Sequence, residues 1–270
     1  WLNRPPRKVT RFRVNRRRVE RIITRSRRFG MLHLNEVKSK KILKSYGFDV
    51  THITEDPRAG EWVDWVEAAH PEHYEAVLST IWAGGIPELE ACGPDKINLR
   101  ERIARARRNL DLSSPEVPHG DGSHYALPFP EEVSQTAWIT MHALDFIRNA
   151  PASQPLYAHI SYVQPHAPWC APNACFDNVD VDAIPAPIAA EWIADPLCPD
   201  AFAGCGSGHL VKEVPEHWRE MRHCYFADIH HLDRQLGRVM DALDEAGRLD
   251  NTYLIFLADR VDALLVQRPE

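Results

Sequence analysis

Two side chains that could do chemistry stand directly after runs that resemble β-strands. Asp259 follows residues 252–258 (T-Y-L-I-F-L-A), a run that is apolar nearly throughout. His166 lies in a proline-flanked loop after the β-rich run over residues 156–163. A carboxylate at the end of a buried strand is costly to keep charged unless a metal ion or another cation lies near it. Asp259 is therefore a candidate metal ligand, and His166, held in a stiff loop, is a candidate to address a substrate oxygen.

Each candidate also has a structural alternative. Asp259 could cap the turn after its strand, and His166 could be an ordinary histidine of a surface loop. His33 is a similar candidate, because it too lies close to a strand end. His119 and His124 flank the stretch H-G-D-G-S-H, whose two glycines favour a flexible turn over a metal-binding loop.

Two long helices are predicted to position these residues. Apolar side chains recur at steps of three and four over residues 130–149 and again from Pro215 to a glycine stop at Gly247. Each helix is followed by one of the two strand-like runs, which is the order typical of an α/β layered domain. Ligands in such domains gather at the carboxyl ends of the strands. We therefore expect His166 and Asp259 to converge on one edge of a sheet.

The remaining segments give weaker patterns. Residues 61–78 have the apolar spacing of a helix. Residues 84–128 and 170–214 are rich in proline, glycine and polar residues and show no sustained period, which predicts two long surface excursions.

Composition excludes several classes of protein. The chain has 270 residues, of which 44% are hydrophobic and 26% charged, as in an ordinary globular protein. There is no apolar run of the roughly 18 residues that a membrane helix needs. The amino terminus is rich in arginine with no apolar stretch after it, so we expect neither a signal peptide nor a membrane anchor, and a cytoplasmic location if the chain is expressed as written. The six cysteines form no C-x-x-C pair, which argues against zinc-ribbon and thioredoxin-like sites.

The charge is distributed unevenly. Residues 1–28 contain eleven arginines, one lysine and one glutamate, so this arm carries about +11 while the whole chain carries −6. An arginine-rich arm can bind nucleic acid or another anionic surface. It lacks interleaved aromatic residues and heptads, however, and it joins abruptly to an acidic domain. We therefore favour an arm that is not part of the fold and does not bind nucleic acid.

The carboxyl-terminal half resembles a known family. Residues 222–259 contain a tyrosine-bearing helix, the run I-H-H-L-D-R-Q-L-G-R-V-M-D-A-L-D-E-A-G, and D-N-T followed by a strand that ends in A-D. This order resembles the sulfatase family of the alkaline-phosphatase superfamily. Residues 155–169 (P-L-Y-A-H-I-S-Y-V-Q-P-H-A-P-W) resemble the strand and P-H-x-P loop of that family. Residues 29–34 (F-G-M-L-H-L) resemble its G-K-x-H segment.

The resemblance implies an α/β/α sandwich with a mostly parallel central sheet over residues 29–259, followed by a non-family tail over residues 260–270. It implies hydrolysis of sulfuric esters of small molecules, with a formylglycine nucleophile made from a C/S-x-P-x-R motif and a divalent cation, usually Ca²⁺. By the same resemblance His33 and His166 are catalytic, with His166 as general acid, and Asp259 is a metal ligand.

The chain departs from the family pattern at several points. It contains no C/S-x-P-x-R motif, Met31 stands in place of the G-K-x-H lysine, and Arg260 follows Asp259 where histidine or asparagine is usual. These departures predict an incomplete, truncated catalytic domain that binds calcium weakly and is inactive or nearly so. Two alternatives stay open: a phosphonate-monoester or phosphodiester hydrolase of the same superfamily, and a non-catalytic protein that binds nucleic acid or acidic surfaces through its arginine arm.

Overall fold

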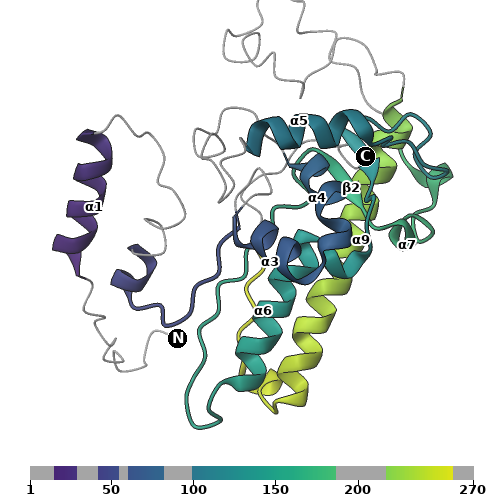
Figure 1. The fold of residues 1–270 in the computed structure, drawn as a ribbon. Helices are drawn as coiled ribbons and strands as arrows, with labels where there is room; N and C mark the ends of the chain where they lie inside the picture. Colours follow the sequence, from purple (N-terminus) through teal and green to yellow (C-terminus); the bar gives the residue numbers. More distant parts are fainter. Residues whose placement is uncertain (1–14, 29–41, 55–59, 82–98, 187–216, 258–270) are drawn as a thin grey trace, which may run out of the picture. The chain divides into compact units, whose positions relative to one another are not determined.

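The chain forms two compact units, here called the amino-terminal and carboxyl-terminal units. The computed structural model describes residues 15–28, 42–54, 60–81, 99–186 and 217–257 (Figure 1). The amino-terminal unit comprises Trp1–Tyr74 and Ile81–Ala104, and the carboxyl-terminal unit comprises Glu75–Thr80 and Arg105–Glu270.

The amino-terminal unit contains helix α1 (Arg16–Arg28), a helical turn over residues 42–46 and helix α3 (Glu61–Ala69). In α1 Val19 is buried, whereas all seven arginines are exposed: Arg16, Arg17, Arg18, Arg21, Arg25, Arg27 and Arg28. The amide of Asn15 donates to the carbonyl of Ser45, which joins the start of α1 to the turn over residues 42–46.

The single helix predicted over residues 61–78 is interrupted. α3 ends at Ala69, Pro71 opens a short 3₁₀ turn (η1, Pro71–His73), and α4 (Tyr74–Thr80) follows. Proline has no N–H to donate and its ring clashes with the preceding turn, so a continuous helix through Pro71 is unfavourable. The prediction of helical structure is confirmed, and the prediction of one continuous helix is wrong.

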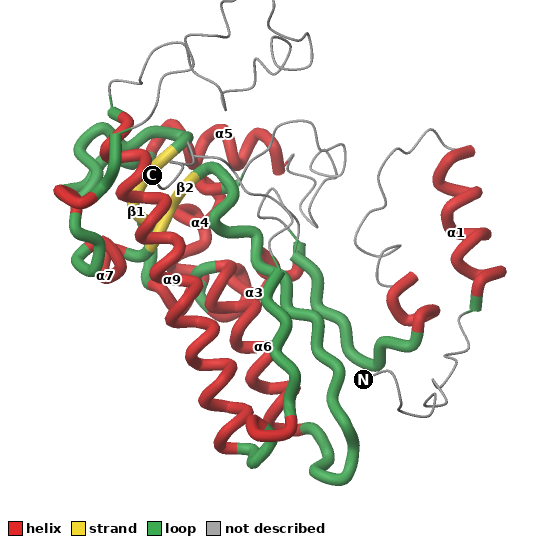
Figure 2. The backbone as a smooth tube through the Cα atoms, turned by 180° about the vertical axis from the view of Figure 1, so that it is seen from behind, coloured by secondary structure: helices red, strands yellow, loops and turns green. Residues whose placement is uncertain are grey.

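The carboxyl-terminal unit contains a pair of short parallel strands, β1 (His124–Ala126) and β2 (Trp169–Ala171). Figure 2 shows the pair beside helix α9 (Trp218–Glu245), which packs against β2. The core between them consists of small and medium side chains: Val117, Ala126, Ala171, Cys175, Phe176, Cys224 and Ala227.

Helix α6 (Gln135–Asn149) lies along α9 (Figures 1 and 2), and the two are held by a second apolar cluster: Leu144, Ile147, Val239, Ala242 and Leu243. The hydroxyl of Ser134 accepts a hydrogen bond from the amide of Ala137 and so caps the start of α6. α9 stops at Glu245, and Gly247 adopts the left-handed conformation, with φ of 63°. Both long helices are thus confirmed, as is the glycine stop.

The two predicted strands are not strands in this structure. Residues 156–163 and 252–257 lack regular secondary structure, and Tyr253 and Phe256 are 98% and 83% exposed. A strand exists only when a neighbour pairs with its backbone. In the described part of the chain, pairing is limited to β1 with β2 and an isolated bridge between Thr54 and Gly60. The prediction of a buried central strand that ends at residue 258 is wrong for the described residues 252–257.

The predicted surface excursions contain regular elements. Residues 84–128 include helix α5 (Leu99–Asn109) and β1, and residues 170–214 include most of β2, helix α7 (Asn173–Phe176) and a 3₁₀ turn (η4, Val181–Ala183). α5 was missed because six charged residues surround the buried Ile103 and Ala106. A strand of three residues is too short to show a period. None of the helices in the described segments has the length and hydropathy needed to cross a bilayer.

Candidate functional site

The loop that carries His166 leads directly into β2. His166 is partly buried, and its amide donates to the carbonyl of Val163 at 3.1 Å. Its Nδ1 lies 2.6 Å from the carbonyl oxygen of Ala167. Because a carbonyl oxygen can only accept, Nδ1 carries the hydrogen of this bond. Any proton that His166 passes to a substrate must therefore leave from Nε2 of the imidazolium form.

Two buried polar residues fix the end of this loop. The amide of Cys170 donates to Oδ2 of Asp228 at 3.0 Å, and Asp228 is fully buried in α9. The amide nitrogen of Gln164 donates to the sulfur of Cys170 at 3.4 Å, and both residues are buried. A buried polar group that loses its hydrogen-bond partner is costly. Asp228 and Gln164 therefore hold the His166 loop against α9, and sequence reasoning identified neither residue.

The segment before the loop is tied to α6. The hydroxyl of Tyr162 lies 3.0 Å from that of Thr140, which is itself fully buried. Burial raises the pKa of Tyr162, while the hydrogen bond with Thr140 works in the opposite direction. The phenol is therefore neutral and positions the segment rather than providing charge.

A charged cluster lies between α9 and the 3₁₀ turn η3 (Glu131–Val133). Glu131 accepts from Arg234 at 2.9 Å and from the side-chain amide of Gln235 at 2.8 Å. His231 is buried, with its Nε2 3.5 Å from Glu131. Desolvation, followed by the charge of Arg234, lowers the pKa of His231 to about 4, so this histidine is neutral at pH 7. Its burial and neutrality indicate a structural role.

A shallow hollow of about 470 Å³ opens beside this cluster, between residues 127–131 and 172–174. It is lined mostly by proline and apolar side chains together with Glu131 and Asn173. None of the predicted site residues lines it.

The predicted site is only partly described. His33 and Asp259 lie outside the described residues, and His166 is placed as above. Their convergence on one edge, and the roles of all three, stay predictions.

A group that the sequence did not reveal forms elsewhere in the same unit. Ligand atoms of His119, His217 and Glu220 lie within 4.8 Å of one another, and this is the one such group of three in the described segments. His217 and Glu220 are three residues apart at the start of α9, a spacing that places two side chains on the same face of a helix. His119 comes from a turn about 100 residues earlier, so no local pattern connects it to them.

Comparison with known proteins decides the family. The family model for sulfatases matches residues 95–267, well over half of the chain. The chain belongs to the sulfatase family. Membership confirms the predicted α/β class with the alkaline-phosphatase-like architecture, of which the parallel β1–β2 pair and its helices are a described part.

Curated relatives agree with this assignment. An arylsulfatase of Clostridium perfringens is 29% identical over 138 residues, which cover 50% of this chain and 28% of the relative. The multifunctional alkaline phosphatase superfamily protein PehA of Trinickia caryophylli is 30% identical over 171 residues, covering 57% of this chain and 33% of the relative. A choline-sulfatase of Rhizobium meliloti is 25% identical over 146 residues, covering 51% and 27%. The sulfatase-family chain thus matches these relatives over about a third of their length or less.

Proposed function

We propose that this sulfatase-family chain supplies part of a hydrolase that cleaves sulfuric esters of small molecules. The observation that carries the proposal is the family match over residues 95–267, which spans both His166 and Asp259. The similarity to an arylsulfatase and a choline-sulfatase supports an anionic ester as the substrate class.

In this proposal His166 is the general acid. Cleavage of the ester S–O bond leaves negative charge on the departing oxygen, and a proton from Nε2 of His166 neutralises it. The hydrogen bond between Nδ1 and the Ala167 carbonyl fixes the ring so that Nε2 is the proton-donating atom. His33 is assigned to the nucleophile side by resemblance alone.

The family is typically metal-dependent, and we assign Asp259 as a ligand of that metal, with Ca²⁺ as the cation. Calcium prefers six to eight oxygen ligands. In the segments that the structure describes, the one gathered group has two imidazoles and one carboxylate, which does not fit calcium. A calcium site would therefore need ligands other than these three side chains.

We further propose that the 270 residues by themselves do not turn over sulfate esters, because they contain no C/S-x-P-x-R motif to provide the nucleophile. Binding is then the informative readout. We expect p-nitrophenyl sulfate to bind in the presence of Ca²⁺ without release of p-nitrophenol. Titration calorimetry should show roughly tenfold weaker binding in His166→Ala, since a hydrogen bond to a charged group contributes about 1.5–3 kcal/mol.

The matched control is His159→Ala, which removes an exposed histidine a few residues away. It should leave binding unchanged. Equal affinity in the wild type and His166→Ala would contradict the role of His166. Turnover that disappears in His166→Ala and persists in His159→Ala would overturn the proposed inactivity and support the hydrolase assignment.

The second candidate is a phosphonate-monoester or phosphodiester hydrolase of the same superfamily. The similarity to the multifunctional alkaline phosphatase superfamily protein PehA, which covers 57% of this chain, supports this second candidate. Parallel titrations with bis-p-nitrophenyl phosphate and p-nitrophenyl phenylphosphonate separate the two candidates. Tighter binding of either compound than of the sulfate ester would select the second.

A further inference from the structure

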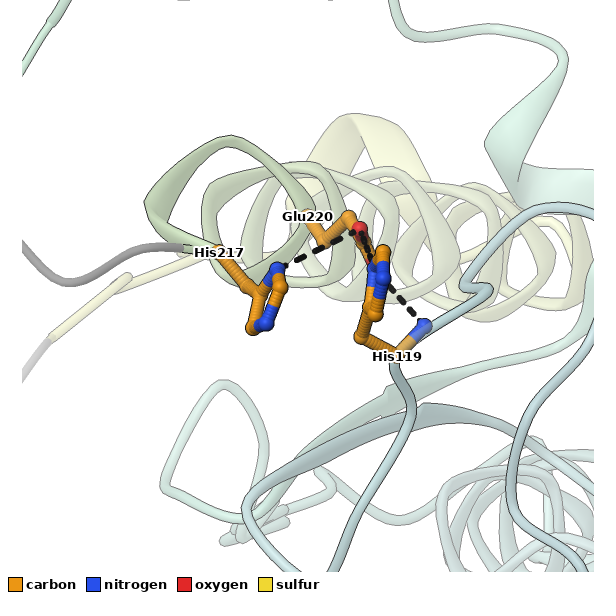
Figure 3. A group of neighbouring side chains, drawn as sticks. All are labelled: His119, His217 and Glu220. Carbon is orange, nitrogen blue, oxygen red and sulfur yellow. Dashed lines mark hydrogen bonds and ion pairs between the residues drawn. The ribbon is translucent and has the colours of Figure 1, made fainter.

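A turn of the carboxyl-terminal unit is fastened to the first turn of α9 by a histidine and a glutamate (Figure 3). The amide of His119 donates to Oε2 of Glu220 at 3.0 Å, and Nδ1 of the same residue lies 2.6 Å from Oε1. His217, the N-cap residue of α9, presents its Nδ1 to the same Oε1 at 3.9 Å. Two imidazoles therefore face one carboxylate.

The two imidazoles also contact each other. The rings of His119 and His217 stack with centroids 3.9 Å apart and planes 14° from parallel. A divalent cation bound between the three side chains would use both imidazoles in their neutral form, which is the form that binds a metal.

The spacing of the ligand atoms is close to that of a tetrahedral metal site. With bonds of about 2.0 Å, two ligand atoms of a tetrahedral zinc ion are about 3.3 Å apart. The observed 2.6 Å between His119 and Glu220 is shorter and the 3.9 Å between His217 and Glu220 is longer. The tetrahedral value therefore lies between the two observed distances. On binding, the cation displaces the proton that His119 shares with Glu220, and that proton goes to solvent.

The surroundings hold the carboxylate in place and leave room for a fourth ligand. The backbone amide and the ring of His119 contact the two carboxylate oxygens of Glu220, at 3.0 Å and 2.6 Å. The backbone bond from His119 to Oε2 orients the carboxylate and leaves Oε1 toward the imidazoles. The side chains of His119, His217 and Glu220 are 57%, 35% and 21% exposed, so water can complete the coordination.

We propose that His119, His217 and Glu220 form a binding site for a divalent transition-metal cation of the zinc class. Two imidazoles and one carboxylate are a ligand set that suits Zn²⁺, whereas Ca²⁺ prefers oxygen ligands only. The site cross-links the turn around His119 to the start of α9. It is separate from the residues assigned above to ester hydrolysis and does not depend on that assignment.

The test is titration calorimetry of the metal-free full chain with Zn²⁺, together with absorption spectra of the Co²⁺ form. We expect the wild type to bind one Zn²⁺ through this site and to unfold at a higher temperature with zinc than without it. Loss of a residue that only orients a ligand typically weakens binding 10- to 100-fold, so His119→Ala, His217→Ala and Glu220→Gln should each weaken it roughly tenfold or more. The Co²⁺ spectrum should be tetrahedral and lack a thiolate charge-transfer band, which excludes the cysteines as ligands.

His159→Ala and Glu245→Gln, both at exposed positions, are the matched controls and should bind as the wild type does. Glu220→Gln keeps an oxygen to accept from the His119 amide, so it preserves the fold while losing the charge. Circular dichroism verifies that each variant is folded. Zinc affinity that is unchanged in the double variant His119→Ala/Glu220→Gln, or no zinc binding by the folded wild type, would overturn the proposal.

Discussion

At the scale of single residues, α9 carries an unusual set of buried polar side chains. Asp228, His231 and Gln235 are each no more than 1% exposed. Asp228 accepts from the Cys170 amide, and Gln235 donates to Glu131. A buried polar group that loses its partner costs about 1–3 kcal/mol. These residues therefore specify how α9 meets β2 and η3, which apolar packing alone does not determine.

His231 should make stability depend on pH. Its pKa is about 4 in the folded protein, against an ordinary value of 6.5, so between these values the unfolded chain binds more protons than the folded one. Stability is full above pH 6.5 and falls as the pH drops from 6.5 to 4. Burial is the main cause of the shift, and the neighbouring charges of Arg234, His230 and Arg238 act in the same direction. We expect a loss of about 2 kcal/mol between pH 7.5 and pH 5 from this residue.

Urea unfolding at the two pH values measures this loss. In His231→Gln the difference between the two pH values should shrink by that amount, because the titrating group is gone. His159→Gln, at an exposed position, should retain the full difference. An unchanged pH dependence in His231→Gln would show that other groups cause the acid sensitivity.

At the scale of elements, the turn that carries His119 depends on one glycine. A Cβ built on Gly120 would overlap the backbone carbonyl of Leu112 and lie 3.2 Å from the carbonyl oxygen of Val117. Backbone atoms cannot move aside as a flexible side chain can. A Cβ built on Gly122, two residues later, would have no atom within 4 Å. The two glycines of H-G-D-G-S-H therefore have different roles, although in the sequence they look alike.

Gly120→Ala should destabilise the protein by about 1–3 kcal/mol, the cost of forcing atoms into a packed site. Gly122→Ala, the matched control in the same turn, should change stability by less than about 0.5 kcal/mol. The free energies of unfolding from urea titrations compare the two. Equal effects would mean that the turn relaxes and that the close approach to Leu112 is not a constraint.

At the scale of the whole molecule, the last described segment presents a row of bulky apolar side chains to solvent. Tyr253, Ile255, Phe256 and Leu257 are each at least 78% exposed. An extended apolar segment without a pairing partner is a site at which chains associate. The sequence predicted burial for this run, and its composition is that of a strand covered on both faces. We therefore expect the purified chain to self-associate through these exposed side chains.

Phe256→Lys should weaken concentration-dependent self-association by roughly tenfold, since burying a phenylalanine side chain contributes about 1.5–3 kcal/mol. Sedimentation velocity over a concentration series measures the effect. Met240→Lys, which replaces an isolated exposed apolar residue on α9, is the control and should associate as the wild type does. Identical association of the wild type and Phe256→Lys would show that residues 252–257 do not mediate it.

The sequence by itself determined the family, the α/β class and the two long helices α6 and α9. Helical periodicity and the glycine stop at Gly247 are local signals, and they act within a few residues of the positions they specify. The start of α6 is set by the Ser134 cap and not by Pro130, which precedes only a 3₁₀ turn. The ordered family pattern over residues 155–259 is likewise readable without coordinates. The match over residues 95–267 confirms the family that this pattern indicated.

The tertiary structure decided which segments pair and which polar residues meet. Strand-like composition at 156–163 and 252–257 did not make strands, because pairing depends on a neighbouring backbone and not on the segment alone. His119 meets Glu220 across 101 positions, and Cys170 meets Asp228 across 58. Such contacts arise only when α9 packs against β1 and β2, so local sequence patterns carry no record of them.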